Sequence, residues 1–152
     1  MNQYNSHTHS HPRPGYLIYR VARLFVKIID QRLKPHQVAS GQIPVLILLS
    51  KAGPMTQVDL AKANEVEQPS MAQMLGRMER DGLIHRSSDP EDGRRSLIHL
   101  TVVSEALISK VTQSLMEVNE QAYKGFTEDE RAKFMKMLSL VIANLEEMAE
   151  TR

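Results

Sequence analysis

The most specific local pattern in this chain lies in residues 81–101, which read DGLIHRSSDPEDGRRSLIHLT. After Gly82 the apolar residues stop following a helical spacing, and the segments 83–86 and 96–101 have the composition of β-strands. The Asp-Gly pair at 92–93 is typical of the tip of a hairpin. We therefore predict a β-hairpin with a long connecting loop that begins directly after a helix.

The residues before this hairpin predict two short helices joined by a tight turn. Thr56 suits the N-cap of a helix over 57–63, because Asp59 lies three residues later, in the acidic first turn. Pro69 suits the first turn of a second helix over 68–81. Two such helices form a helix-turn-helix, and a hairpin directly after it is a wing.

The second of these helices has one apolar and one polar face. The residues expected in the core are Met71, Met74, Leu75 and Met78. The residues expected to contact DNA are Gln68, Ser70, Gln73 and Arg77. Polar side chains at the N-terminal end of such a helix are what recognition of base edges in the major groove requires. Taken alone, a polar face more often belongs to a solvated helix, but the adjoining capped helix and hairpin favour DNA contact.

Two adjacent arginines, Arg94 and Arg95, lie near the expected tip of the hairpin and are also predicted to contact DNA. An arginine on a thin projecting hairpin fits the narrow minor groove, where the negative potential is concentrated. Asp92 lies two residues before Arg94, and its carboxylate is expected to orient the guanidinium group. The alternative interpretation is a solvated charged loop.

On the N-terminal side, apolar residues recur at helical spacing over 16–33, and a short apolar helix is predicted over 42–52. Residues 1–15 are polar and are expected to form a flexible arm. This arm has histidines at alternating positions 7, 9 and 11, so metal binding is an alternative. Further ligands at a fixed spacing are missing, and we favour the solvated arm.

Beyond the hairpin, the sequence predicts two more helices. The first is expected to begin at Ser104, and the second at a capping box formed by Thr127 and Glu130. The apolar stripes of the terminal helices are wider than one chain of this size covers. We therefore predict that the segments 16–41 and 102–152 are dimerisation helices.

The predicted fold is mainly α with a small β-hairpin wing, in which the winged helix-turn-helix over 42–101 is flanked by the dimerisation helices. A chain of 152 residues is expected to form one domain. The net charge of the whole chain is only +1, but it is +5 in residues 1–41, −1 in residues 42–101 and −3 in residues 102–152. DNA binding by the near-neutral middle segment must therefore depend on locally placed arginines.

Several classes of function are disfavoured by composition. The chain has no cysteine, which excludes disulfides, thiolate nucleophiles and thiol redox sensing. No apolar run is long enough for a membrane span and no secretory signal is visible, so we expect a cytoplasmic protein. His36, His85 and His99 do not form a clustered ligand set, and we predict no metal and no cofactor. No motif places a nucleophile beside a base, so we predict no enzyme activity.

Four short segments, in this order along the chain, form a recognisable combination: Leu60-Ala61, RMERDGLI at 77–84, Asp89-x-x-Asp92-x-Arg94 and Leu100-Thr101. Together they resemble the winged helix-turn-helix of the MarR family of bacterial regulators, and the order of the flanking helices extends the resemblance over nearly the whole chain. The resemblance implies a homodimer that places recognition helices in successive major grooves of a pseudo-palindromic operator and wings in the flanking minor grooves. It also implies repression that a small, often aromatic and anionic, ligand relieves by binding between the dimer helices and the DNA-binding lobe.

The resemblance also implies roles for individual residues. Arg94 corresponds to the minor-groove arginine of the family, and Asp92 corresponds to its supporting acid. Ser70, Gln73 and Arg77 occupy the outward positions of the recognition helix. Gln73 stands where many members have a basic residue, a departure that bears on the sequence preference.

The residues proposed for the ligand are on the first helix: Tyr16, Tyr19, Arg20 and Arg23. An arginine beside aromatic rings suits an aromatic carboxylate, and the alternative is that these residues are solvated or interfacial. A further alternative for the whole chain is a winged-helix module that binds a protein instead of DNA, which the near-neutral middle segment permits.

Overall fold

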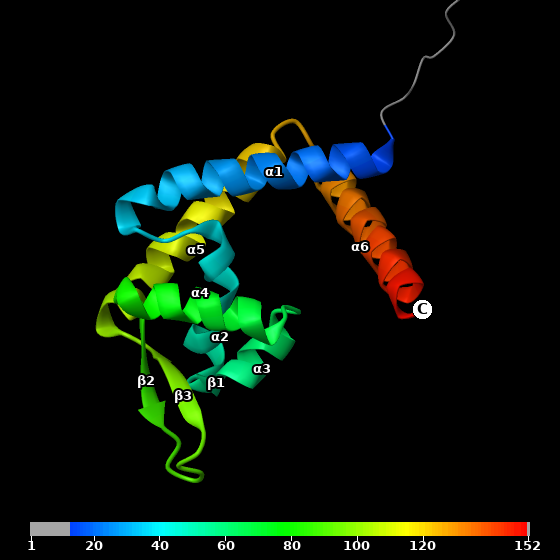
Figure 1. The fold of residues 1–152 in the computed structure, drawn as a ribbon. Helices are drawn as coiled ribbons and strands as arrows, with labels where there is room; N and C mark the ends of the chain where they lie inside the picture. Colours follow the sequence, from blue (N-terminus) through cyan, green and yellow to red (C-terminus); the bar gives the residue numbers. More distant parts are fainter. Residues whose placement is uncertain (1–12, 152) are drawn as a thin grey trace, which may run out of the picture. The chain divides into compact units, whose positions relative to one another are not determined.

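The computed structural model of the protein describes residues 13–151 and has the predicted fold class, mainly helical with a small antiparallel sheet (Figure 1). The elements are α1 (Pro14–Leu33), the 3-10 turns η1 (Lys34–His36) and η2 (Ser40–Gln42), α2 (Ile43–Ala52), β1 (Met55–Thr56), α3 (Gln57–Ala63), α4 (Gln68–Arg80), β2 (Ile84–Ser88), β3 (Ser96–Leu100), α5 (Val102–Ala122) and α6 (Glu128–Glu150). The chain divides into two compact units. The first ends at Leu115, and the second begins at Met116.

The first unit has one hydrophobic core, to which its helices and its sheet all contribute. Side chains that are fully buried or nearly so come from α2, α3, α4 and the sheet: Val45, Leu46, Leu49, Leu60, Met71, Leu75, Met78, Ile84 and Ile98. The predicted apolar face of α4 is therefore confirmed, with Met74 partly buried against the same core. This core fixes the helix-turn-helix of α3 and α4 on the sheet from which the wing extends.

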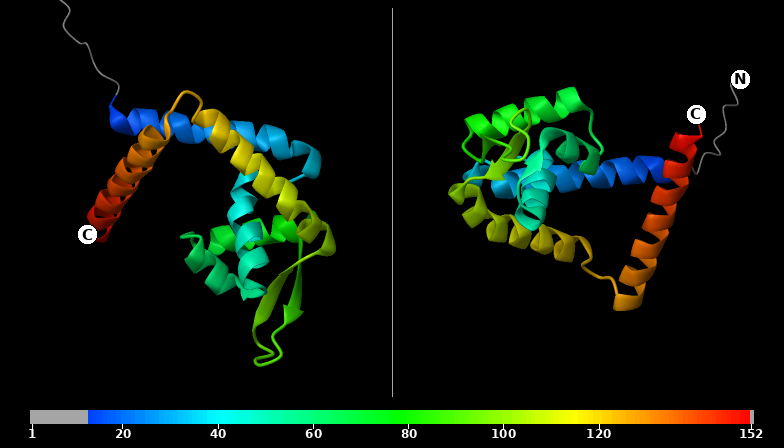
Figure 2. Two further views of the ribbon diagram at one scale, coloured as in Figure 1. Left: turned by 180° about the vertical axis from the view of Figure 1, so that it is seen from behind. Right: turned by 90° about the horizontal axis from the view of Figure 1, so that it is seen from below.

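The sheet has three strands in the order β1-β3-β2, all antiparallel. Ile84 pairs with Leu100 at one end of the hairpin ladder and Ser88 pairs with Ser96 at the other, so the strand predicted over 83–86 extends two residues further. Strand β1 was not predicted, because two residues carry no detectable alternation and their partners lie about 40 positions away in the sequence. Figure 2 shows the hairpin of β2 and β3 projecting from the helices of this unit.

The tight connections of the helix-turn-helix agree with the sequence prediction. Gly82 has a φ of 73°, and the amide of Leu83 donates to the carbonyl of Met78 over 2.8 Å, which is the left-handed ending predicted for α4. Glu65 has a φ of 53° in the turn after α3, where the amide of Val66 donates to the carbonyl of Ala61. Both turns satisfy helix carbonyls that would otherwise lack a donor.

Two predicted helix starts differ from the structure. Helix α1 begins at Pro14, so the last part of the predicted arm over 1–15 is helical, since proline suits the first turn of a helix. Residues 1–12 of that arm, with its three histidines, lie outside the described residues. Helix α5 begins two residues before Ser104, because Thr101 and not Ser104 caps it: the amide of Ser104 donates to Thr101 Oγ1 over 3.3 Å.

Ser104 has a buried structural role. Its hydroxyl accepts from the amide of Thr101 and donates to the carbonyl of Leu83, which ties the start of α5 to the residue directly before β2. We expect Ser104→Ala to lower the free energy of unfolding by about 1–3 kcal/mol, because these buried backbone groups lose a partner. Urea unfolding measures the change. Ser50→Ala, at an exposed position of α2, is the control and should change the free energy by less than about 0.5 kcal/mol. Equal effects of the two variants would contradict the assignment.

The second unit contains the end of α5 and all of α6. Thr127 caps α6 as predicted, accepting from the amide of Glu130, whose carboxylate accepts in return from the amide of Thr127 over 2.8 Å. Arg131 donates to the carboxylate of Glu120 over 3.0 Å, and the ring of Phe134 lies edge-on to that of Tyr123 at 6.2 Å. Polar caps and an aromatic cluster thus hold the turn between the two helices.

The capping box makes the stability of this unit depend on pH. The hydrogen bonds from the backbone amide and then from the hydroxyl of Thr127 lower the pKa of Glu130. Since the folded-state pKa lies below the unfolded-state value, the ionised carboxylate stabilises the fold above the unfolded-state pKa, and this contribution is lost as the pH falls through the folded-state pKa. We expect Glu130→Ala to lower the thermal unfolding midpoint at about pH 7 and to have a smaller effect at about pH 3. Glu146→Ala, at the other end of α6, should show no loss of stability at neutral pH; a pH-independent effect of Glu130→Ala would contradict the prediction.

Candidate nucleic-acid interface

The polar face of α4 is exposed on the surface of the first unit. Ser70, Gln73 and Arg77 are exposed. The residues that alternate with them along the helix, Met71, Leu75 and Met78, are buried in the core. The fourth predicted contact residue, Gln68, is also exposed, and its side-chain oxygen accepts from Gln57 Nε2 over 3.2 Å. The structure therefore brings the four predicted residues of α4 onto the solvent side of one rigid helix.

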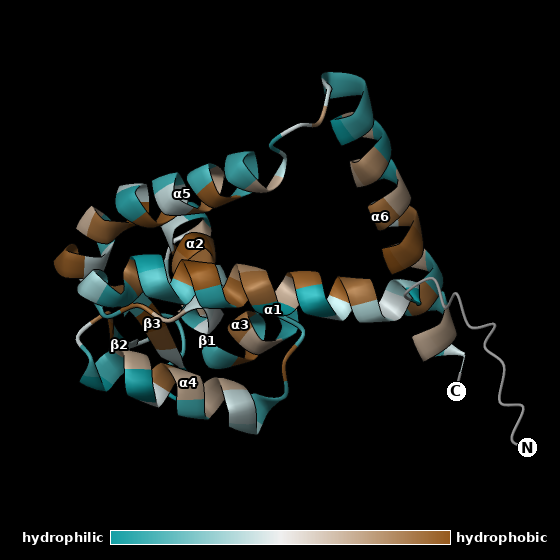
Figure 3. Ribbon diagram, turned by 90° about the horizontal axis from the view of Figure 1, so that it is seen from above, coloured by the Kyte–Doolittle hydropathy of each residue, from teal (hydrophilic) through white to brown (hydrophobic). Residues whose placement is uncertain are grey.

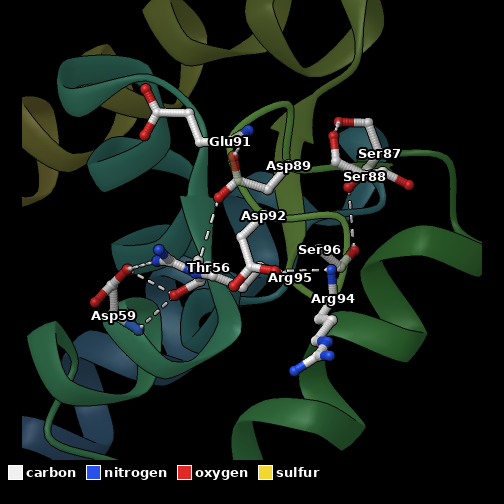
Figure 4. A network of polar contacts seen from close by, with 10 residues as sticks. All are labelled: Thr56, Asp59, Ser87, Ser88, Asp89, Glu91, Asp92, Arg94, Arg95 and Ser96. Carbon is white, nitrogen blue, oxygen red and sulfur yellow. Dashed lines mark hydrogen bonds and ion pairs between the residues drawn. The ribbon is translucent and has the colours of Figure 1, made fainter.

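The wing presents Arg94 beyond the end of the hairpin ladder. Its side chain is exposed, and in the described part of the chain no ion pair engages its guanidinium group. Asp92 Oδ1 accepts from the backbone amide of Arg94 over 3.1 Å, so its carboxylate holds the backbone of the loop and not the guanidinium group as predicted (Figure 4). This bond constrains the loop backbone, and no residue among 13–151 forms an ion pair with Arg94.

The neighbouring Arg95 has different surroundings. Its Nε lies 3.8 Å from Asp89 Oδ2, and its Nη2 lies 3.9 Å from Asp59 Oδ2 at the start of α3. Figure 4 shows Arg95 directed toward Thr56 and Asp59 while Arg94 is directed away from them. Within the described residues, therefore, only Arg95 of these two adjacent arginines is ion-paired, although the sequence gives no reason to distinguish them.

Another ion pair links the hairpin to the recognition helix. Arg86 Nε of β2 lies 3.1 Å from Glu79 Oε2 of α4. The sequence pattern placed Asp59 in the first turn of its helix and Asp89 in the wing motif, but it predicted none of the ion pairs that these residues, Arg86 and Glu79 form. Each belongs to a charged pair whose members come together only through the packing of the hairpin beside the helices, so a single sequence offers no local signal for them.

The four residues predicted to hold a ligand lie together along α1. Tyr16, Tyr19, Arg20 and Arg23 line a shallow recess of about 340 Å³ that is formed by this helix alone. The guanidinium carbon of Arg23 lies 5.6 Å from the centre of the Tyr19 ring, within the range of a cation–π contact. Cations and aromatic rings are thus adjacent in the way that an aromatic anion requires, on a surface open to solvent.

A larger cavity of about 820 Å³ lies where the end of α2, the hairpin and the start of α5 meet. His85 and His99, for which the sequence predicted no clustering, both line this cavity. They are paired across the hairpin, and their stacked rings have centres 4.9 Å apart. His99 Nε2 lies 2.7 Å from the hydroxyl of Ser87. Within residues 13–151 no group of three or more potential metal ligands comes together.

The terminal helices leave wide apolar surfaces exposed. Along α1, the side chains of Leu17, Ile18, Val21 and Leu24 are 40–48% exposed. Along α6, no residue is buried, and Leu140, Ile142, Leu145 and Met148 are 48–69% exposed. Figure 3 shows hydrophobic segments on both helices. No helix in the described part of the chain combines the length and apolar character needed to cross a membrane.

Comparison with known proteins gives consistent results. The family model of the MarR family matches residues 39–96, which span α2 to the wing. A point mutant of MarR from E. coli, in a complex with operator DNA, is 27% identical with a TM-score of 0.76, over 84% of this chain and 91% of that chain. MepR from S. aureus, in a complex with DNA, is 26% identical with a TM-score of 0.79, over 86% of this chain and 97% of that chain.

The fold is also that of BpsR from Bordetella bronchiseptica, whose DNA binding is regulated by 6-hydroxynicotinic acid. That protein is 24% identical with a TM-score of 0.76, over 90% of this chain and 97% of that chain. The similarity therefore extends beyond the winged helix-turn-helix to the terminal helices.

Proposed function

Because the chain belongs to the MarR family of winged helix-turn-helix proteins, we propose that it binds duplex DNA with sequence specificity and regulates transcription. The observation that carries this proposal is the exposed polar face of α4, opposite its buried apolar face, in the same unit as a projecting hairpin with an exposed arginine, Arg94. Two proteins of the same fold form complexes with DNA. The function is binding without catalysis, in the cytoplasm where the operator is accessible.

In this proposal α4 lies in the major groove and the wing lies over the minor groove. Gln68, Ser70, Gln73 and Arg77 contact base edges or neighbouring phosphates. Arg94 enters the minor groove, and Asp92 holds the loop backbone that presents it. The small net charge of the winged helix-turn-helix is no obstacle, because these cations are concentrated on the surface that faces the phosphates.

A salt titration tests DNA binding against the alternative of a protein-interaction module. We expect the protein to shift a duplex selected from a random pool, with an affinity that falls steeply as salt rises, because phosphate contacts release counterions. Fluorescence anisotropy at several salt concentrations measures the slope. Absence of any duplex binding at low salt would contradict the proposal and favour the protein-interaction module.

We further propose that the protein is a homodimer joined through its terminal helices. The apolar surfaces of α1 and α6 are of the kind that monomers rarely leave to solvent. The net charges of the two terminal segments, +5 and −3, have opposite signs and favour association. Binding of two half-sites of a pseudo-palindromic operator requires this symmetry.

Sedimentation tests the dimer. We expect twice the mass of one chain at micromolar concentration, and we expect Leu145→Glu to produce monomers because it places a charge within the apolar surface of α6. Glu146→Ala, at the adjacent position, is the control and should remain dimeric. A stable folded monomer of the unmodified protein at micromolar concentration would contradict the proposal.

We also propose that the protein is a repressor released by a small anionic aromatic ligand that binds at Tyr16, Tyr19, Arg20 and Arg23. The adjacent cations and rings on α1 support this class of ligand. A protein of this fold, BpsR, is regulated by a small heteroaromatic acid, so the fold permits such regulation. The ligand releases DNA only if it binds one conformation of the dimer more tightly than the other.

Substitution of the arginines separates DNA binding from ligand response. We expect Arg20→Ala or Arg23→Ala to leave DNA affinity nearly unchanged and to abolish release by an aromatic carboxylate that releases the unmodified protein, with salicylate and 6-hydroxynicotinate as the probes. DNA binding with and without each probe is measured by anisotropy. Lys110→Ala, which removes an exposed cation of α5 outside this recess, is the comparison. Unchanged release in both arginine variants would place the ligand elsewhere.

A further inference from the structure

We propose that Arg95 is a positioning residue that holds the wing against the helix-turn-helix and does not act through contact with DNA. The inference rests on the proposed DNA-binding function. It starts from the contrast between Arg94, which has no ion pair with any residue that the structure describes, and Arg95, whose cation lies between Asp89 of the wing loop and Asp59 of α3. These two arginines are adjacent in sequence and opposite in role.

The geometry of Arg95 is that of a bridge between two elements. Separate nitrogen atoms of its guanidinium group face the two carboxylates, with Nε toward Asp89 and Nη2 toward Asp59. Asp89 is the more buried partner, with 11% of its side chain exposed, and its other oxygen accepts from the amide of Glu91 over 2.9 Å. Asp59 Oδ2 accepts from the hydroxyl of Thr56 over 2.6 Å. Both carboxylates are therefore held in place by hydrogen bonds that do not involve Arg95.

Within the described residues, the hydrogen bonds of the wing loop join its residues to one another, whereas the contact of Arg95 with Asp59 joins the loop to α3. The hairpin ladder ends at the pair Ser88 and Ser96, so residues 89–95 lie beyond it. Between this loop and the start of α3 lies a recess of about 430 Å³, which both wing arginines line. Arg95 makes an ion pair across it to Asp59, and Arg94 belongs to the same segment of backbone.

The two carboxylates also make Arg95 a poor ligand for phosphate. Its single positive charge faces two negative charges, so the local charge around it is negative and unattractive to DNA. Breaking the bridge would free a cation for DNA but would release the loop that carries Arg94. The two possible roles of Arg95 therefore predict opposite effects when its partner Asp59 is neutralised.

The decisive variant is Asp59→Asn in the full-length protein. Asparagine still accepts from the hydroxyl of Thr56 but no longer attracts Arg95. If Arg95 positions the wing, we expect Asp59→Asn and Arg95→Ala each to weaken binding of a duplex selected from a random pool, by roughly threefold to fivefold because half-exposed ion pairs are individually weak. We expect the double variant to resemble either single variant, because both substitutions break the same bridge.

Arg95→Lys separates charge from bridging. Lysine keeps the positive charge but has one nitrogen and cannot face both carboxylates as the guanidinium group does. We expect its affinity to fall to near that of Arg95→Ala. Lys110→Ala, an exposed cation on α5, is the control and should bind within about twofold of the unmodified protein.

Hydrogen exchange in the free protein tests the bridge without DNA. The amide of Asp89 donates to the carbonyl of Arg95, and the amide of Arg95 donates to the carbonyl of Asp92. We expect exchange across residues 89–95 to accelerate in Arg95→Ala and Asp59→Asn and to stay unchanged in Lys110→Ala. Unchanged exchange in the first two variants, tighter DNA binding by Asp59→Asn, or full affinity of Arg95→Lys would each overturn the proposal. Failure of the unmodified protein to bind any duplex would instead contradict the proposed function. The exchange measurement would still test the bridge, because it needs no DNA.

Discussion

Replacing Arg94 with alanine is expected to weaken binding to the selected operator and to unrelated duplexes together, by about 1.5–3 kcal/mol or roughly 10-fold to 150-fold. Arg94 is exposed and forms no ion pair within residues 13–151, so its charge is available to the minor groove. Minor-groove chemistry distinguishes A·T from T·A poorly, and an arginine there senses groove width and phosphate potential more than base identity.

The same substitution should flatten the dependence of affinity on salt by about one unit of slope, because one phosphate-neutralising cation is removed. It should leave the unfolding midpoint unchanged, since the wing tip makes no contribution to the core. Titrations with both duplexes at two salt concentrations measure the effect, and Lys110→Ala is the matched control. A loss confined to the operator would show that Arg94 reads sequence and would contradict this assignment.

Replacing Gln73 with alanine is expected to cause a loss of operator binding of similar size, but with a different dependence on DNA sequence and on salt. Its side chain is exposed on α4, and an amide that both donates and accepts is suited to a base edge in the major groove. The loss should be about 1–3 kcal/mol at the selected operator and much smaller at unrelated duplexes, because the hydrogen bonds exist only at the matching base. The salt slope should not change, because no charge is removed.

A scrambled duplex of the same composition provides the comparison for Gln73→Ala, and Ser50→Ala provides a control for a neutral polar substitution away from α4. Selection from a random pool with Gln73→Ala should also yield sites with a relaxed preference at one or two positions per half-site. Equal losses for Arg94→Ala and Gln73→Ala on both duplexes would show that the proposed division between affinity and specificity is wrong.

Much of the fold was predictable because its determinants are local. The caps of α3 and α6, the left-handed ending of α4 at Gly82 and the opposite faces of α4 each depend on residues within a few positions of one another. Such patterns constrain the backbone through short-range hydrogen bonds and helical periodicity, which a single sequence displays directly. The four predicted contact residues of α4 are on one exposed face for the same reason.

The parts that were missed depend on contacts between distant segments. Strand β1 exists only because Met55 and Thr56 pair with β3. The start of α5 involves both Thr101 and Ser104, and Ser104 also donates to the carbonyl of Leu83, directly before β2. The stacking of His85 on His99 follows from the register of the hairpin, which composition does not specify.

The sequence by itself determined that a recognition helix and a basic hairpin follow one another, because their signals lie within each element. Only the tertiary structure separated the two wing arginines. Arg94 and Arg95 have the same chemistry and adjacent positions, so no local pattern distinguishes them. The distinction arises because the packing of the hairpin beside α3 brings Asp59, 36 positions away in the sequence, within 3.9 Å of one guanidinium group and leaves the other in solvent.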